Sequence, residues 1–210
     1  MPAAADEKAL IAVAQNAAGK IFEQDQVRKL AQASVPGDGA AVGLLTLSDT
    51  SPVLDIECRY FGENATDMTL AADPARRWWE AGPGQGYVGG FNEGKIIKVL
   101  ARGNRQVPQV VRAVCDRIGV KPGDLDLLVT NQPNRLLLRN WSEALGISPD
   151  RHRDTFHECG NLFAVAIPVN FEAAILDGQI GAGDIVMMAG FAHAGDFAGA
   201  AAIQWGGTRT

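Results

Sequence analysis

Several features are scarce in this sequence of 210 residues, and each scarcity excludes a class of protein. The chain has 3 cysteines, Cys58, Cys115 and Cys159, an odd number that argues against a disulfide scaffold and fits a reducing compartment. No apolar run approaches the roughly 20 residues that a membrane-spanning helix needs. The amino terminus lacks the basic start and long apolar core of a secretory signal peptide. We therefore expect a cytoplasmic protein without a membrane anchor.

An excess of basic charge is also missing. The formal net charge is −5 at pH 7, whereas a protein that binds the nucleic-acid backbone needs a concentrated basic face. The sequence is instead 47% apolar and contains 24 glycines, which suits a large buried core with tight turns. Its length fits one large domain, or one domain and part of another.

The apolar pattern predicts strands and helices that alternate along the chain, which indicates an α/β layered domain. Residues 67–90 are the least regular part and predict a long loop or a cap over a cleft. The expected strands are 9–15 (buried), 40–47, 53–60 (half-exposed), one that begins at 125, 185–188 and 200–205. The expected helices are one from Gln106 with Pro108 in its first turn, 135–145 and 161–176.

A cluster of polar amides follows the apolar run 125–130. Asn131, Gln132 and Asn134 stand at the carboxyl end of this strand, where an open α/β sheet usually presents ligand-facing groups. Asn161 stands at the start of the third expected helix, which it could also cap. The amides predict a cleft that can donate and accept hydrogen bonds. Asparagine cannot carry out the proton transfers that a histidine performs.

Several short motifs occur in the order of a known family. They are 127–134, 159–161 followed by 166–168, 177–180 with 183–184, and the stretch 190–205. Together these motifs resemble the carboxy-terminal half of β-ketoacyl-ACP synthase III, and 37–42 resembles the strand entry that closes the amino-terminal half. The resemblance runs from about residue 9 to residue 205. It implies a thiolase-like layered fold, with residues 51–210 as one complete βαβαβαββ half and residues 1–50 as the last two strands of the other half.

The resemblance also implies candidate site residues. The Gly-Asn turn of the family matches Gly160 and Asn161, and the histidine of its His-Gln-Ala-Asn loop matches Asn131, which is a departure from the family pattern. His193 lies in the loop that supplies a backbone oxyanion donor. The family's nucleophilic cysteine lies upstream of the first residue here, and none of the three cysteines matches its position. The expected catalytic set is therefore Asn131, Asn161 and His193.

Two further residues are expected to bind substrate. Asn134 matches the asparagine that holds the pantetheine arm, and Lys98 roughly aligns with a lysine that the family uses near the carrier protein. The resemblance implies acyl thioesters of CoA or acyl carrier protein as substrates, with no tightly bound cofactor and no metal. The sequence does not identify the acyl group, and both fatty-acid and specialised metabolism are compatible with it.

Each candidate also has a simpler interpretation. Asn131 could satisfy loop backbone groups, Asn161 could cap its helix, Asn134 could stabilise its turn, and Lys98 and His193 could be ordinary surface residues. A rebuilt pair of His157 and Cys159 is conceivable, as is a zinc site from these two with His152 and His193, although no CxxC-type spacing supports it.

Two motifs in residues 67–90 stay open or are discounted. Trp78 and Trp79 could line a substrate tunnel or pack the loop. Residues 84–89 match GxGxxG, but no apolar strand precedes them.

Three functions follow from the predicted half-fold. Strands 9–15 and 40–47 would leave backbone edges and apolar faces uncovered, which favours a partner polypeptide. In the first hypothesis the chain is a subunit of a split acyltransferase whose partner, resembling the family's amino-terminal half, supplies the cysteine. In the second it is a non-catalytic companion of a complete synthase. In the third it is a stand-alone module that binds acyl-CoA or acyl carrier protein.

Overall fold

The computed structural model describes residues 8–16, 35–48, 50, 52–67, 70–72, 87–89, 93–192 and 194–207. Within these ranges no helix is both long enough and apolar enough to cross a bilayer. The strands are β1 (Lys8–Gln15), β2 (Gly39–Thr46), β3 (Val53–Tyr60), β4 (Leu70–Ala72), β5 (Tyr87–Gly89), β6 (Leu127–Thr130), β7 (His152–Arg153), β8 (Ile185–Ala192) and β9 (Phe197–Gln204). The α-helices are α1 (Glu93–Ile118), α2 (Arg135–Leu145), α3 (Phe156–Cys159) and α4 (Ala166–Leu176).

Five strands form the central sheet in the order β3-β9-β8-β6-β7. Strand β6 pairs in parallel with β7 and β8, whereas β9 is antiparallel to both β8 and β3. Apart from β4 and β5, which form a separate two-stranded sheet between β3 and α1, the chain from β3 onward alternates strand and helix three times and then adds two consecutive strands. This is the βαβαβαββ order expected from the sequence.

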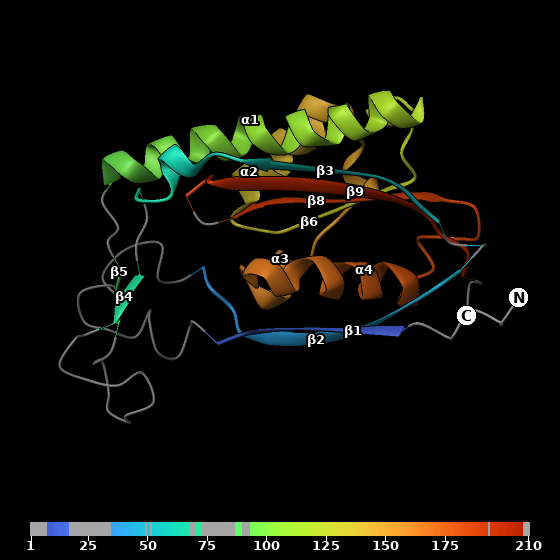
Figure 1. Ribbon diagram of the computed structural model, residues 1–210, viewed down its shortest axis with the longest axis horizontal. Coiled ribbons are helices and arrows are strands. Elements are labelled where there is room, and N and C mark those ends of the chain that lie inside the picture. The colour runs from blue at the N-terminus through green and yellow to red at the C-terminus, as the bar shows by residue number, and fades with distance from the viewer. Residues whose placement is uncertain are drawn as a thin grey trace, which may run out of the picture.

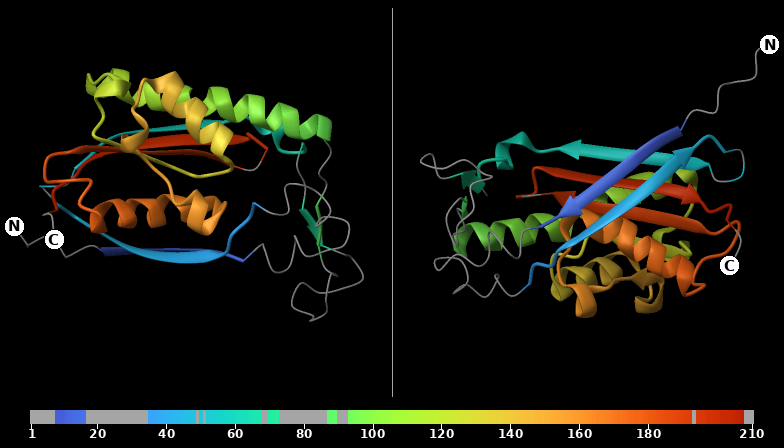
Figure 2. Two further views of the ribbon diagram at one scale, coloured as in Figure 1. Left: turned by 180° about the vertical axis from the view of Figure 1, so that it is seen from behind. Right: turned by 90° about the horizontal axis from the view of Figure 1, so that it is seen from below.

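The elements stack in layers (Figure 1). Helices α1 and α2 cover one face of the five-stranded sheet, α3 and α4 lie on the other face, and the hairpin of β1 and β2 lies beyond α4 (Figures 1 and 2). The spacing expected for a helix after residue 106 is confirmed, since Val107, Val110, Val111 and Val114 are fully buried in the core between α1 and the sheet. A smaller core fills the space between α4 and the sheet.

The hairpin of β1 and β2 is covered on one face only. Val13 and Ala41 pack against Leu162 and its neighbours at the start of α4. The opposite face carries apolar side chains that are exposed: Leu10 (71%), Val42 (68%) and Leu44 (61%). Strand 9–15 is thus present, but the expectation that it is buried is wrong, because the described residues cover only its α4 side.

Several expected boundaries are also wrong. Helix α1 begins at Glu93 rather than near Gln106, so Pro108 lies inside the helix and not in its first turn. The expected helix 161–176 is a 3₁₀ turn (Phe163–Val165) followed by α4. The last two strands extend to Ala192 and back to Phe197, which shortens the loop between them. In residues 67–90 the described part is the antiparallel pair β4 and β5.

Candidate functional site

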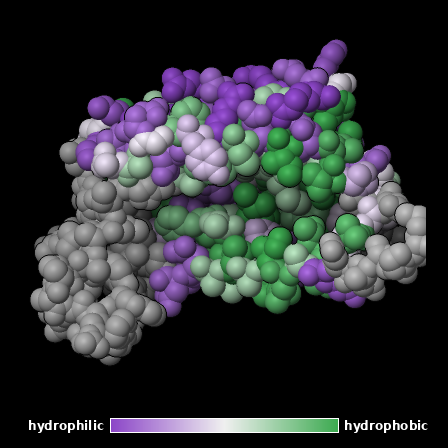
Figure 3. All heavy atoms as spheres, in the orientation of Figure 1, coloured by the Kyte–Doolittle hydropathy of each residue, from purple (hydrophilic) through white to green (hydrophobic). Residues whose placement is uncertain are grey.

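A large apolar pocket opens between the sheet, helix α1, the start of α4 and the segment that leads into β2. Its volume is about 870 Å³, within the range of about 300–1,000 Å³ that is usual for small-molecule sites. Figure 3 shows apolar side chains gathered below the polar surface of α1, where the surface is hollowed. The aromatic residues of the lining are Phe163, Phe191 and Phe197. All three asparagines that the sequence nominated line this pocket: Asn131, Asn134 and Asn161.

The side chain of Asn131 is anchored at both ends of its amide. Nδ2 donates to the Phe191 carbonyl at 3.0 Å, and Oδ1 accepts from the Phe191 N–H at 3.3 Å. This pairing fixes which atom is nitrogen, because only one orientation gives two hydrogen bonds. Gly190 permits the close approach, since a Cβ there would lie 2.7 Å from Asn131 Oδ1. No second partner of Asn131 Nδ2 is found in the part of the chain that the structure describes, so its other hydrogen can be donated to a ligand.

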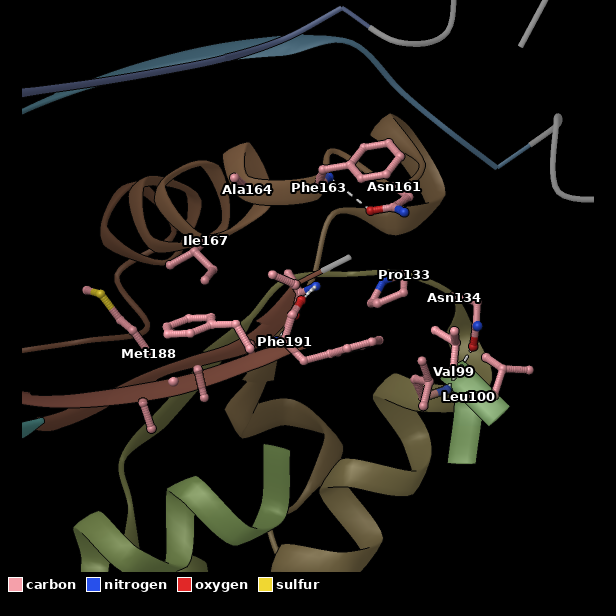
Figure 4. Close-up of a pocket in the computed structure, with 18 of the residues that line it drawn as sticks. Val99, Leu100, Pro133, Asn134, Asn161, Phe163, Ala164, Ile167, Met188 and Phe191 are labelled. Carbon is pink, nitrogen blue, oxygen red and sulfur yellow. Dashed lines mark hydrogen bonds between the residues drawn. The ribbon is translucent and has the colours of Figure 1, made fainter. Parts of the chain in front are cut away.

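Asn161 is anchored by its oxygen alone. Its Oδ1 accepts from the Phe163 N–H at 2.9 Å, as Figure 4 shows, and no partner of its Nδ2 is found among the described residues. Phe163 has φ of 52°, the sole positive φ of a non-glycine residue in the described ranges. Such a conformation costs on the order of 1–3 kcal/mol and persists only where its surroundings enforce it. The hydrogen bond from the Phe163 N–H to Asn161 Oδ1 helps to hold Phe163 in this conformation.

The backbone of the Asn161 turn is held from the hairpin side. Asn161 N donates to the Val35 carbonyl at 2.7 Å, and Gly37 N donates to the Asn161 carbonyl at 2.9 Å. Gly160, with φ of 67°, has its α-carbon against the Val35 carbonyl, where a side chain would overlap it. Glycine is required there for both reasons. The chain entering β2 therefore fixes the position of Asn161.

Chemically, the two amides form a pair of hydrogen-bond donors beside an apolar pocket. Both carbonyl oxygens are occupied by backbone N–H groups, so each side chain offers N–H to a ligand. Such a pair can hold a carbonyl oxygen or the oxyanion that develops when the carbonyl is attacked. Neither amide can accept a proton from a reacting group, so acid-base catalysis needs another residue.

The other nominated residues lie in different places. Asn134 caps α2, with Oδ1 accepting from the Leu137 N–H at 2.9 Å, and it lines the pocket away from Asn161 (Figure 4). Lys98 is exposed on α1 and is not part of the lining, although its neighbours Val99 and Leu100 are. His193 lies outside the described residues, as do Trp78, Trp79 and residues 84–86 of the glycine motif.

The cysteines occupy three different environments. Cys115 is buried in the main core, and burial raises the pKa of its thiol to about 11, so it stays protonated. Cys159 packs beneath the hairpin and His157 is exposed; neither lines the pocket. Cys58 does line the pocket, from β3.

His152 is used inside the structure. It is buried between Thr130, whose hydroxyl lies 2.9 Å from Nε2, and Ser142, whose hydroxyl lies 2.7 Å from Nδ1. Desolvation lowers its pKa to about 4, so the ring is neutral near pH 7. Among the described residues no group of three or more metal-ligating side chains occurs.

Two buried amides next to the site were given no role from the sequence: Gln132 was named only as a member of the amide cluster, and Asn170 was not noted. Gln132 and Asn170 are both fully buried and hydrogen-bond to each other at 2.9 Å. A signal for Asn170 was present, because it is the one amide within the otherwise apolar stretch 166–171 of α4. A buried polar side chain normally requires partners, so its position predicted a network. No local pattern identified Phe191 as the residue that anchors Asn131, since the two are 60 residues apart.

Sequence comparisons relate this chain to known proteins. Residues 115–205 match the family described as 3-oxoacyl-[acyl-carrier-protein] synthase III C terminal. The chain is 32% identical, over 178 residues, to β-ketoacyl-[acyl-carrier-protein] synthase III of Thermosynechococcus vestitus, covering 80% of this chain and 51% of that protein. It is 30% identical to the 2-heptyl-4(1H)-quinolone synthase subunit PqsC of Pseudomonas aeruginosa over 169 residues, 77% of this chain and 47% of that protein.

Solved structures show the same fold. The β-ketoacyl-[acyl carrier protein] synthase III of Thermus thermophilus superposes with a TM-score of 0.78 at 23% identity, covering 96% of this chain and 60% of that one. The chain therefore has the layered fold expected from the sequence, and it spans about half the length of the curated relatives that it matches.

Proposed function

The chain is a β-ketoacyl-ACP synthase III-like protein of the thiolase superfamily, and on that premise we propose that it forms one wall of the active site of an acyltransferase. The enzyme acts on acyl thioesters of CoA or acyl carrier protein, and a partner chain supplies the cysteine. The observation that carries this proposal is the pair of asparagine amides. Both have their oxygens tied to backbone and their nitrogens available to the same apolar pocket.

In the proposed reaction the partner's thiolate attacks the carbonyl carbon of the thioester. A new carbon–sulfur bond forms, the carbonyl oxygen becomes an oxyanion, and Asn131 and Asn161 stabilise it through their N–H groups. Collapse of this intermediate breaks the original carbon–sulfur bond and expels the carrier as a thiolate. Because Asn131 cannot act as a base, the proton of the attacking thiol goes to a group outside this pair. The pocket accommodates the acyl chain.

A partner is supported by the uncovered hairpin. We propose that residues 1–50 belong to a thiolase half that the partner completes, and that residues 51–210 form the other half. Both edges of the two-stranded sheet are unpaired in the described residues, and its outer face is apolar. An open edge and an exposed apolar face together favour association with another chain. The partner would add strands to the hairpin and close the pocket.

Native mass spectrometry of the isolated complex, before and after incubation with octanoyl-CoA, tests the proposal. We expect a second chain in the complex and an octanoyl group on that chain. A complex that contains the Cys58→Ser variant of this chain should be acylated on the partner to the same extent, because the proposed nucleophile lies there. Acylation on Cys58 itself would contradict the split site. Co-purification with a full-length synthase would instead favour the non-catalytic companion, and the chain alone with bound acyl-CoA would favour the binding module.

Activity measurements with variants test the role of the amides. Asn161→Ala should lower the rate of acyl transfer by about 10²–10³-fold, the usual cost of removing one oxyanion donor, while assembly stays intact. Asn140→Ala is the matched control, because Asn140 Nδ2 donates to Asn104 Oδ1 at 3.0 Å between α2 and α1, away from the pocket. Equal rates for wild type and Asn161→Ala would exclude the oxyanion role.

A further inference from the structure

A single buried side chain, that of Gln132, connects Asn131 with the turn that carries Asn161. Gln132 lies between Asn131 and Pro133 and is fully buried. Its Oε1 accepts from the Thr155 N–H at 3.1 Å and from Asn170 Nδ2 at 2.9 Å. Its Nε2 donates to the Gly160 carbonyl at 2.6 Å and to Thr155 Oγ1 at 3.3 Å. An amide can make four hydrogen bonds, and Gln132 makes all four.

The partners of Gln132 are themselves cross-linked. Thr155 Oγ1 donates to Asn170 Oδ1 at 2.8 Å, and Asn170 Nδ2 also lies 3.4 Å from the Thr130 carbonyl at the end of β6. The end of β6, the segment before α3 and the helix α4 are thus joined through polar groups that water does not reach. A satisfied buried network of this kind holds one arrangement, because any displacement leaves a buried group without a partner.

The network ends at the turn that carries Asn161. Gly160 directly precedes Asn161, and its carbonyl is held by Gln132. On the other side the same turn is held by Val35 and Gly37. Gln132 is also covalently adjacent to Asn131. Its four bonds therefore set the position of one donor relative to the other.

We propose that Gln132 is a positioning residue that sets the separation and orientation of the Asn131 and Asn161 amides. It acts through the Gly160 carbonyl, with Thr155 and Asn170 holding its own amide in place. The inference rests on the proposed function for its consequence in acyl transfer, but the positioning itself belongs to this chain alone.

Gln132→Met tests the proposal, since methionine retains the unbranched length and removes all four hydrogen bonds. In the full chain labelled with ¹⁵N, the side-chain NH₂ resonances of Asn161 should shift and broaden. Asn140→Ala, which breaks an amide pair elsewhere, should leave those resonances unchanged. Thr155→Val provides a milder variant should Gln132→Met fail to fold. It removes the hydroxyl while leaving the bond from Gln132 to Gly160, so the Asn161 resonances should shift in the same direction by less.

Octanoyl-pantetheine labelled with ¹³C at its carbonyl supplies a second readout. Bound to wild type, its carbonyl stretch should be lowered by the two donors. In Gln132→Met the stretch should return towards its value in water and binding should weaken by about tenfold, as for one lost hydrogen bond, and in Thr155→Val both changes should be smaller. A change in stability alone would not move this frequency.

The two proposals fail in different ways. If the stretch of the bound probe is the same in wild type and Asn161→Ala, the oxyanion role is wrong, while the Asn161 resonances still decide the role of Gln132. If the Asn161 resonances keep their wild-type positions in both Gln132→Met and Thr155→Val, Gln132 does not position the pair and the inference is overturned.

Discussion

The five-stranded sheet and the hairpin of β1 and β2 lie on opposite sides of α4, and they differ in how their apolar residues are covered (Figure 2). The sheet has a buried core against α1 and α2 and a second core against α4. The hairpin packs against the start of α4 on one face and exposes Leu10, Val42 and Leu44 on the other. The sheet therefore contains the packing that stabilises this chain, whereas the outer face of the hairpin contributes little.

The difference matters for the site because the two regions hold one donor each. Asn131 follows β6 and is anchored to Phe191 at the end of β8, both within the sheet. Asn161 is anchored through its backbone to Val35 and Gly37, which lead into the hairpin. One donor thus belongs to the well-covered region, and the other depends on the region that we propose a partner completes. If the proposal is right, we expect assembly and activity to be linked at Asn161.

The largest expected effect on the free energy of unfolding comes from the core that covers the five-stranded sheet. Trp141 of α2 is fully buried, donates from Nε1 to the Gly103 carbonyl at 2.9 Å and packs edge-on against Phe191. Trp141→Ala should lower the free energy of unfolding by about 3–5 kcal/mol in urea denaturation. Leu136→Ala on the exposed face of the same helix should change it by no more than about 0.5 kcal/mol. Similar losses of unfolding free energy in the two variants would mean that the buried core does not stabilise the chain more than the exposed face of α2.

A second effect on the sheet side depends on pH. His152 is 6% exposed, and burial lowers its pKa from 6.5 to about 4, partly opposed by the charge of Asp154. The unfolded chain therefore binds a proton before the folded one, so stability is full above pH 6.5 and falls as the pH drops towards 4. The two pKa values differ by an amount that corresponds to about 3 kcal/mol.

Unfolding by urea between pH 7 and pH 4 measures this loss. His152→Gln can keep hydrogen bonds to Thr130 and Ser142 without titrating, so its stability should fall less over the same range. Hydrogen bonds to Arg59 and Arg117 lower the pKa of Glu57 in wild type and in His152→Gln alike, so its contribution cancels in the comparison of the two. A wild-type slope equal to that of His152→Gln would mean that the buried histidine is not responsible.

Alanine substitutions at two glycines of the segment that forms and precedes β2 should have opposite effects on the free energy of unfolding. A Cβ on Gly37 would overlap the Cys159 carbonyl, whereas a Cβ on Gly43 would meet nothing within 4 Å. Gly37→Ala should therefore lower the free energy of unfolding by about 1–3 kcal/mol, as overpacking does. Gly43→Ala should raise it by about 0.5 kcal/mol, since alanine is favoured over glycine in a strand. Equal effects would show that the hairpin is not tightly held at Gly37.

The sequence predicts most of the elements because their signals are local. Helix 135–145 has the predicted boundaries, with Gly146 in a left-handed conformation at its end, and strand 53–60 matches as well. The start of α1 was missed because the apolar side chains of residues 93–105 are confined to the short stretch 96–101, and Gly94 and Gly103 weaken the helical pattern on either side of it. Helix α1 packs against β3, β8 and β9, and tertiary contacts of this kind cannot be read from a short stretch of sequence.

The sequence predicted three of the asparagines that line the pocket, but not how their side chains are held. Asn131, Asn134 and Asn161 were identified by their positions after a strand and in a Gly-Asn turn, and all three line the pocket. That Asn131 is tied to Phe191 depends on strand pairing between segments far apart in the chain. The four bonds of Gln132 depend on how α4 packs. Such long-range contacts follow from the fold and from no local pattern.

The smallest expected effect on stability lies on the outer face of the hairpin. Leu44 pairs with Leu10 across the strands, and both side chains are exposed. Leu44→Lys should change the free energy of unfolding of the isolated chain by no more than about 0.5 kcal/mol, because no buried contact is lost. In the complex, however, it should weaken association with the proposed partner at least tenfold, because a charge would be buried in an apolar interface. Urea denaturation of the chain and affinity measurements on the complex give the two values.

Arg139→Ala, on the exposed face of α2, is the control that should change neither. A large loss of stability in the isolated chain would mean that the outer face is already packed, and the contrast between hairpin and sheet would then be wrong.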